Sequence, residues 1–289
     1  MASLDRRPEL RVRPREIIIR CEKRCDQRRK RIEHPNVRAN MLLRRLPNIR
    51  SLSIDWADEK YAFAPIFLQY LEHNHLKEVT FLGKQGSLNQ IGAFSTTPSL
   101  SSIVAKDLNP ASKLSLHLLD PNPAGHHSPR LKLMDLGSSH FPHTELRRLF
   151  EIFPMVTTVN CAVPGKEAFS GPSRHPWYIV MASSLSASLI AQAFAPLQGK
   201  LVSLRLNDGP VTIWPDRGNT QMDLREFTCL KVLDVPSACY FRESLKAQRN
   251  SIRALLPHSL EEFKVRALAS EPLWKFFTTI QALTNLAEV

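Results

Sequence analysis

The chain has 289 residues, of which 43% are hydrophobic, so it is long and apolar enough to bury a core, which excludes disorder by composition. Proline (21 residues) outnumbers glycine (10), which argues against glycine-rich phosphate loops and favours many short elements with sharp ends. Most of the net charge of +12 lies in the first 50 residues, where 16 Lys and Arg face six Asp and Glu; the remaining 239 residues hold 23 against 21.

Five scattered cysteines do not form a disulfide pattern, no apolar run reaches the roughly 18 residues that span a bilayer, and no secretory signal is visible. We therefore expect a monomer in the cytoplasm or nucleus, with reduced thiols and no membrane contact.

Residues 1–45 are expected to form a basic helical arm that caps the rest of the chain, with a charge-dense helix over residues 16–32. Two interpretations of this arm remain open. Residues 11–45 could bind nucleic acid or an import factor, because clustered cations displace counterions from phosphates. The helix could instead be the polar cap that a terminal repeat requires, which the interspersed acids and the lack of aromatic residues favour. The candidate basic residues are Arg24, Arg28, Arg29, Lys30 and Arg31.

An apolar triplet with the spacing L-x-x-L-x-L recurs through residues 46–289. Successive copies begin 27, 24, 31, 25, 45, 29, 30 and 26 residues apart, mostly near the period of leucine-rich repeats. The last two apolar residues of each triplet alternate, as a short strand with one buried face requires, and such strands must stack on neighbours. The copies are Ile49/Leu52/Ile54, Leu76/Val79/Phe81, Leu100/Ile103/Ala105, Leu131/Met134/Leu136, Val156/Val159/Cys161, Leu201/Leu204/Leu206, Leu230/Leu233/Val235 and Leu260/Phe263/Val265.

The segments between triplets indicate helices, because apolar residues recur three and four positions apart over residues 39–46, 64–71, 144–153 and 181–194. The predicted fold is α/β: an irregular leucine-rich-repeat solenoid, with short parallel strands on the concave face and helices on the convex face. An ordinary α/β domain is the alternative, but eight copies in phase are hard to obtain by chance. A ninth copy begins at Leu286 and breaks off at Val289, which favours a chain truncated at its C-terminus.

Residues that flank the two strand positions should point into the concave face. The 24 such positions contain five acids and four bases, a mixture that suits protein recognition, whereas a nucleic-acid groove would be basic. The candidate partner-binding residues on this face are Asp55, Glu78, Asp135, Asn160, Arg205, Asp234, Lys264 and Arg266.

The 45-residue interval between two triplets contains a Pro- and Gly-rich insertion over residues 163–178. Insertions in repeat proteins often lie on the binding face, and Arg174, Trp177 and Tyr178 are residue types that anchor interfaces. The alternative, that the two aromatic residues pack on the long helix that follows, stays open.

Three sequence segments resemble those of a known family: LLRRLPNIRSLSI (42–54), LREFTCLKVLDVPSACYF (224–241) and LLPHSLEEFKVRAL (255–268). They resemble the irregular leucine-rich-repeat region of fungal F-box-type proteins. The resemblance implies a protein-recognition surface, with an F-box that recruits a ubiquitin-ligase scaffold. An F-box itself is not detected, because both Leu-Pro pairs, at Leu46 and Leu256, precede repeat strands.

The sequence contains no G-x-S-x-G, P-loop, G-x-G-x-x-G or H-E-x-x-H motif, so we predict no catalytic residue, cofactor or metal site, and no enzymatic activity. The predicted function is recognition of another protein, which the resemblance narrows to the substrate-recognition part of an F-box-like ubiquitin-ligase adaptor. The alternative is a nuclear protein that binds nucleic acid through residues 11–45.

Overall fold

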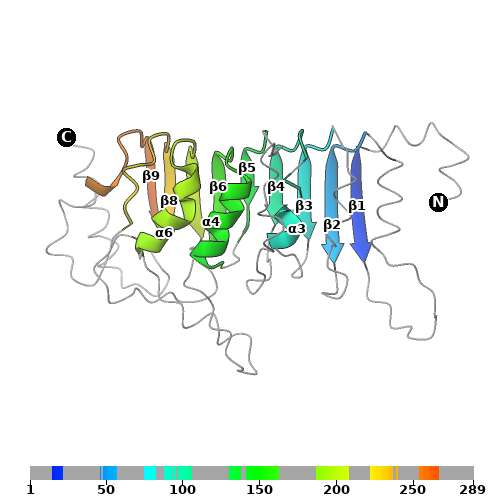
Figure 1. Cartoon of the computed structure of the whole chain (residues 1–289), viewed down its shortest axis with the longest axis horizontal. Coiled ribbons are helices and arrows are strands. Elements are labelled where there is room, and N and C mark those ends of the chain that lie inside the picture. The colour runs from blue at the N-terminus through cyan, green and yellow to red at the C-terminus, as the bar shows by residue number, and fades with distance from the viewer. Residues whose placement is uncertain are drawn as a thin grey trace, which may run out of the picture. The chain divides into compact units, whose positions relative to one another are not determined.

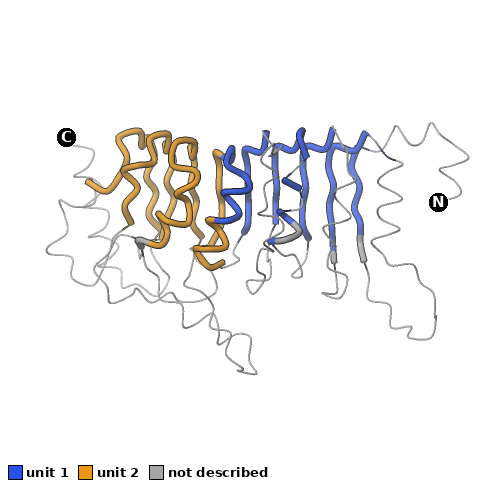
Figure 2. The backbone as a smooth tube through the Cα atoms, in the orientation of Figure 1, with its two compact units in different colours: residues 1–139, 148–156 blue, residues 140–147, 157–289 orange. Residues whose placement is uncertain are grey.

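The computed structural model describes residues 15–21, 46, 48–56, 75–82, 88–92, 94–95, 97–105, 130–137, 141–162, 187–207, 222–236, 239 and 254–266. The chain divides into two compact units, coloured separately in Figure 2. Unit 1 comprises residues 1–139 and 148–156, and unit 2 comprises residues 140–147 and 157–289.

The described residues form nine strands that follow the order of the sequence, five in unit 1 and four in unit 2, and the fold is α/β (Figure 1). Every neighbouring pair within a unit is parallel. Unit 1 contains β1 (Glu16–Cys21), β2 (Ser51–Trp56), β3 (Glu78–Leu82), β4 (Ser102–Ala105) and β5 (Leu133–Asp135). Unit 2 contains β6 (Thr158–Ala162), β7 (Ser203–Asn207), β8 (Val232–Pro236) and β9 (Glu262–Arg266).

Within each unit, helices lie on one face of the strands (Figure 1). In unit 1, α3 (Leu88–Gly92) lies over the sheet, and Phe94 just beyond it meets Phe81 of β3 edge to face, with ring centroids 5.9 Å apart. In unit 2, α6 (Ala187–Phe194) is followed by the 3-10 turn η5 (Ala195–Leu197), and its Ile190 and Phe194 are fully buried. The helix α4 (His143–Ile152) contributes residues to both units.

The apolar triplets form the core, as the sequence predicts. In the seven copies from Ile49 to Val235 every triplet residue is at most 2% exposed. On β3, β4 and β7 the buried side chains alternate with more exposed ones. Cys161 is one of them and behaves as a small buried hydrophobe. The last copy, on β9, is only half-buried.

The strands β2 to β5 and β7 to β9 begin in the same way. The carbonyl of the residue before one strand accepts two consecutive N–H groups from the next repeat: Arg15 O accepts from Arg50 N (2.8 Å) and Ser51 N (2.9 Å). The same pair of bonds recurs at the carbonyls of Arg50, Lys77, Ser101, Thr157, Val202 and Lys231. Because each strand is aligned on its predecessor in this way, the triplets stay in phase within each unit.

The predicted helix over residues 16–32 is wrong for residues 16–21, which form β1. Three consecutive β-branched residues, Ile17, Ile18 and Ile19, favour a strand over a helix. Ile17 and Ile19 align with Leu52 and Ile54 of β2, so Pro14-x-x-Ile17-x-Ile19 is a further copy of the triplet with proline in its first position. Residues 16–21, which the sequence assigned to the arm, thus pair with β2 as a strand of the sheet.

The helix predicted over residues 144–153 is confirmed as α4, and the one over 181–194 is confirmed from residue 187 onward. Residues 39–45 and 64–71, the rest of the arm and the ninth triplet lie outside the described residues. The short helix α3 was not predicted, because its five residues are too few to show a helical period.

Substitution of Leu233 tests the core assignment. Leu233→Asp is expected to lower the free energy of unfolding by at least about 4 kcal/mol, because it leaves a cavity and an unpaired carboxylate where the natural side chain is fully buried. The matched change Leu82→Asp should cost less than about 1 kcal/mol, since Leu82 is 36% exposed on the opposite face. Thermal and urea unfolding followed by circular dichroism measures both. Equal stability of the two variants would refute the assignment of faces.

Candidate interaction surface

The candidate surface of unit 2 is the sheet face opposite the buried triplets, which we call the polar face of unit 2. Strand register places its residues in three rows across the sheet, with neighbouring strands about 4.8 Å apart. The first row is Thr158, Ser203, Val232 and Glu262, and the second is Asn160, Arg205, Asp234 and Lys264. The third consists of two pairs, Ala162 with Asn207 and Pro236 with Arg266, because the pairing of β7 with β8 ends at the second row.

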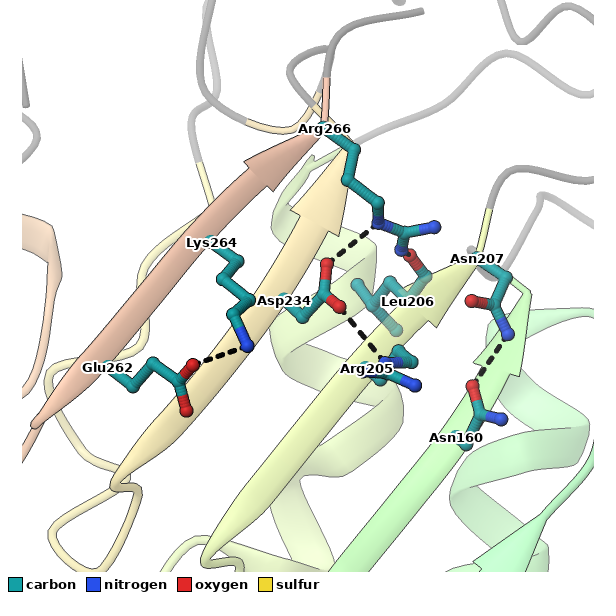
Figure 3. A network of polar contacts seen from close by, with 8 residues as sticks. All are labelled: Asn160, Arg205, Leu206, Asn207, Asp234, Glu262, Lys264 and Arg266. Atoms are coloured by element: carbon teal, nitrogen blue, oxygen red, sulfur yellow. Dashed lines mark hydrogen bonds and ion pairs between the residues drawn. The ribbon is translucent and has the colours of Figure 1, made fainter. Parts of the chain in front are cut away.

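Asp234 is the centre of this face. Its side chain is only 9% exposed, and each carboxylate oxygen accepts a hydrogen bond from a different arginine (Figure 3). Arg205 Nε on β7 donates to Oδ2 at 3.0 Å, and Arg266 Nε on β9 donates to Oδ1 at 2.7 Å. A buried carboxylate without such partners would be costly, so the two arginines make this position of Asp234 possible.

Arg266 makes a second contact, from Nη2 to the backbone carbonyl of Leu206 on β7. The register explains it. Val232 N donates to Val202 O, so a ladder that advances two residues at a time would require the N–H of residue 236 to donate to Leu206 O. Residue 236 is proline and has no N–H, and the β7–β8 pairing stops at Arg205 and Asp234. The guanidinium of Arg266 thus supplies the hydrogen bond that the proline cannot.

Two further polar pairs border this cluster in Figure 3. Asn207 Nδ2 donates to Asn160 Oδ1 at 2.6 Å, and Lys264 Nζ forms an ion pair with Glu262 on the same strand. Arg205 and Arg266 remain 55% and 37% exposed at the side chain, so their guanidinium groups are held by Asp234 but still reach solvent.

Other ion pairs of unit 2 lie outside the polar face. Lys231 and Glu261 stand just before β8 and β9, and their 2.7 Å hydrogen bond raises the pKa of Lys231 above its ordinary value. The hydrogen bond from Arg225 lowers the pKa of Asp223. All four side chains are more than 40% exposed, so these pairs contribute little to stability.

The predicted residues of unit 1 lie on the face of its strands opposite the buried triplets. Asp55 and Asp135 are half-buried at the ends of β2 and β5, and Glu78 is exposed at the start of β3. Asp135 has a local role, because its Oδ1 accepts the N–H of Gly137 at 2.9 Å. Gly137 adopts a left-handed conformation (φ 61°) that suits glycine, so the pair closes the turn after β5.

The structure thus brings together Arg205, Asp234 and Arg266, with Asn160 and Lys264 on the same face. Arg174, Trp177 and Tyr178, and the basic residues Arg24, Arg28, Arg29, Lys30 and Arg31, lie outside the described residues. Sequence reasoning missed the role of the Leu206 carbonyl. Pro236 could have indicated this role, because a proline inside a strand with neighbours on both sides removes one backbone N–H donor and leaves a carbonyl of the neighbouring strand without its hydrogen bond.

No group of three or more His, Cys, Asp or Glu residues within the described ranges is arranged to hold a metal ion, and no helix there is long and apolar enough to cross a bilayer. Comparison of the chain with family models, curated proteins and solved structures finds no match.

A double-mutant cycle tests whether the Arg266 side chain replaces a ladder bond. Arg266→Met should cost about 2–3 kcal/mol in the natural background, because it leaves the Leu206 carbonyl without its donor and removes one partner of Asp234. In a Pro236→Ala background the cost should be about 1 kcal/mol smaller, since alanine at this position can donate its own backbone N–H.

Urea unfolding of the four proteins gives the coupling energy. Arg205→Met is the matched control, because Arg205 binds Asp234 through its Nε and has no role in the contact between Arg266 and the Leu206 carbonyl; its cost should be the same in both backgrounds. A coupling energy of zero for Arg266 would refute this explanation.

Proposed function

We propose that the chain is an irregular leucine-rich-repeat solenoid that recognises another protein through the polar face of unit 2. Repeated strands in sequence order support this proposal, because β2 to β8 each carry a buried triplet and place other residues on the opposite face. The resemblance to fungal F-box-type proteins extends it to a substrate-recognition part of an F-box-like ubiquitin-ligase adaptor.

The observation that carries the proposal is the pair of arginines fixed by Asp234. An exposed arginine normally loses side-chain entropy when a partner binds it, but here the Nε atoms of Arg205 and Arg266 are already held. Planar guanidinium groups fixed in this way suit directional contacts with carboxylate or carbonyl oxygens, and arginine is enriched among residues that dominate binding energy.

The charge balance of this face also favours a protein partner. Arg205, Lys264 and Arg266 face Asp234 and Glu262, so the net charge is +1 (three minus two). A nucleic-acid surface would be strongly basic, whereas signs that alternate from strand to strand fix the register and identity of a protein partner.

Nucleic-acid binding by residues 11–45 is a second candidate, supported by the excess of ten positive charges in the first 50 residues (16 minus six). Because Glu16–Cys21 is a strand of the sheet, deletion of the whole arm would also remove β1. The arm is therefore better tested by replacing Arg28, Arg29, Lys30 and Arg31 with serine.

Quantitative affinity capture from an extract of the source cell, treated with nuclease, tests the proposal. Arg205→Glu is expected to reduce the recovery of specific partner proteins at least tenfold, equivalent to about 1.4 kcal/mol. Arg225→Glu is the matched control, because it makes the same charge change at an exposed pair outside the polar face, and it should recover partners as the natural chain does.

The capture also separates the two functions. Unchanged recovery with Arg205→Glu would contradict recognition by the polar face. Loss of captured material after nuclease treatment or with the serine variant of residues 28–31, but not with Arg205→Glu, would support the nucleic-acid alternative.

A further inference from the structure

Unit 1 exposes aliphatic side chains on the sheet face opposite its core. Ile18 is 51% exposed, and Leu82 and Leu133 are each 36% exposed; these are the large exposed hydrophobic residues of the described part of the chain. They stand on β1, β3 and β5, at positions that alternate with buried or half-buried residues. Exposed apolar area of this kind costs about 25 cal/mol per Å² until a partner covers it.

Strand register arranges the surrounding residues in rows, as in unit 2. The first row is Glu16, Ser51, Glu78, Ser102 and Leu133, and the second is Ile18, Ser53, Thr80, Val104 and Asp135. The side chains on β2 and β4 in these rows are short, apart from Val104. The longer side chains therefore stand on β1, β3 and β5, and these alternate strands are about 9.6 Å apart. They are Glu16, Ile18, Glu78, Leu133 and Asp135.

The charges of these two rows are all negative. Glu16 and Glu78 are exposed on β1 and β3, and Asp135 is half-buried on β5. The rows hold no Lys or Arg, although the whole chain carries a net charge of +12. The third row, to which Leu82 belongs, contains one cation and one acid, Arg20 and Asp55, which pair with each other in the strand register. An acidic surface with exposed aliphatic side chains therefore stands within a basic protein.

We propose that this surface binds a protein segment in which Lys or Arg residues alternate with aliphatic residues. We call it the acidic–apolar face: Glu16, Ile18, Glu78, Leu82, Leu133 and Asp135. The aliphatic residues of the segment cover Ile18, Leu82 and Leu133, and its cations approach Glu16 and Glu78. Complementary charge at these positions sets the alignment, while burial of the aliphatic side chains supplies most of the affinity.

This site is distinct from the polar face of unit 2 in composition and in the sign of its charge. It does not depend on Arg205, Asp234 or Arg266, so either site can fail its test without affecting the other.

The test uses a fluorescein-labelled peptide of six Lys-Val repeats and measures anisotropy with the full chain at 0.15 M salt, where attraction beyond about 8 Å is screened. Saturable binding is expected despite the positive charge of both molecules. A peptide of six Lys-Ser repeats should bind at least tenfold more weakly, because it cannot cover the aliphatic residues.

Variants locate the site. The double variant Glu16→Lys/Glu78→Lys should raise the Kd for the Lys-Val peptide at least tenfold, and Ile18→Ser about fivefold. Glu226→Lys/Glu261→Lys makes the same change in net charge at exposed positions of unit 2 and should leave the Kd within twofold. Unfolding temperatures of all variants confirm that they are folded.

Three results would overturn the proposal: no saturable binding by the natural chain, an equal loss of affinity in the two double variants, or equal affinity for the Lys-Val and Lys-Ser peptides.

Discussion

The structure depends on one constraint: each strand has an apolar side that only its neighbours and the helices can bury. A single repeat offers two or three apolar residues, such as Leu204 and Leu206, and has no core of its own. Stacking solves this problem only if successive strands keep the same alignment. Within each unit, the carbonyl before one strand accepts two N–H groups from the next repeat and so provides that alignment in the backbone, independently of the side chains. The residues that point away from the core therefore do not set the alignment of the strands, and both candidate surfaces are built from these residues.

Much of this arrangement could be predicted, because the triplet spacing reports directly which residues are buried. The eight strands from β2 to β9 begin where the triplets place them, and the outward residues follow from alternation. The first strand was missed for two physical reasons: Pro14 occupies the first triplet position, and the arginines around Ile17–Ile19 made the segment resemble a charged helix. A β-branched run was the stronger signal, since such side chains lose χ1 freedom in a helix and pack well on a pleated sheet, whereas the arginines reflect only solvent exposure.

The site was predicted less completely than the fold. Alternation placed Arg205, Asp234 and Arg266 on one face, but it could not show that a single carboxylate holds both guanidinium groups, because Arg266 reaches it diagonally from another row. The same holds in unit 1, where alternation placed Asp135 on the outward face but could not show that it also closes its own turn through Gly137. The exposure of Ile18 could not be predicted either, because it depends on the strand β1, which the sequence indicated to be part of a helix.

The contact between Arg266 and the Leu206 carbonyl has a consequence for how unit 2 comes apart. In a simple repeat array each repeat interacts only with the next, so the array can lose repeats one at a time from its end. Arg266 lies on β9 and its acceptor on β7, two strands away, while Asp234 between them binds both sides. Loss of β9 therefore takes a hydrogen bond from β7 and an ion pair from β8 together. We therefore expect β7, β8 and β9 to separate less independently than the strands of a simple array, so that a protein held on the polar face would rest on a surface whose strands resist opening one by one.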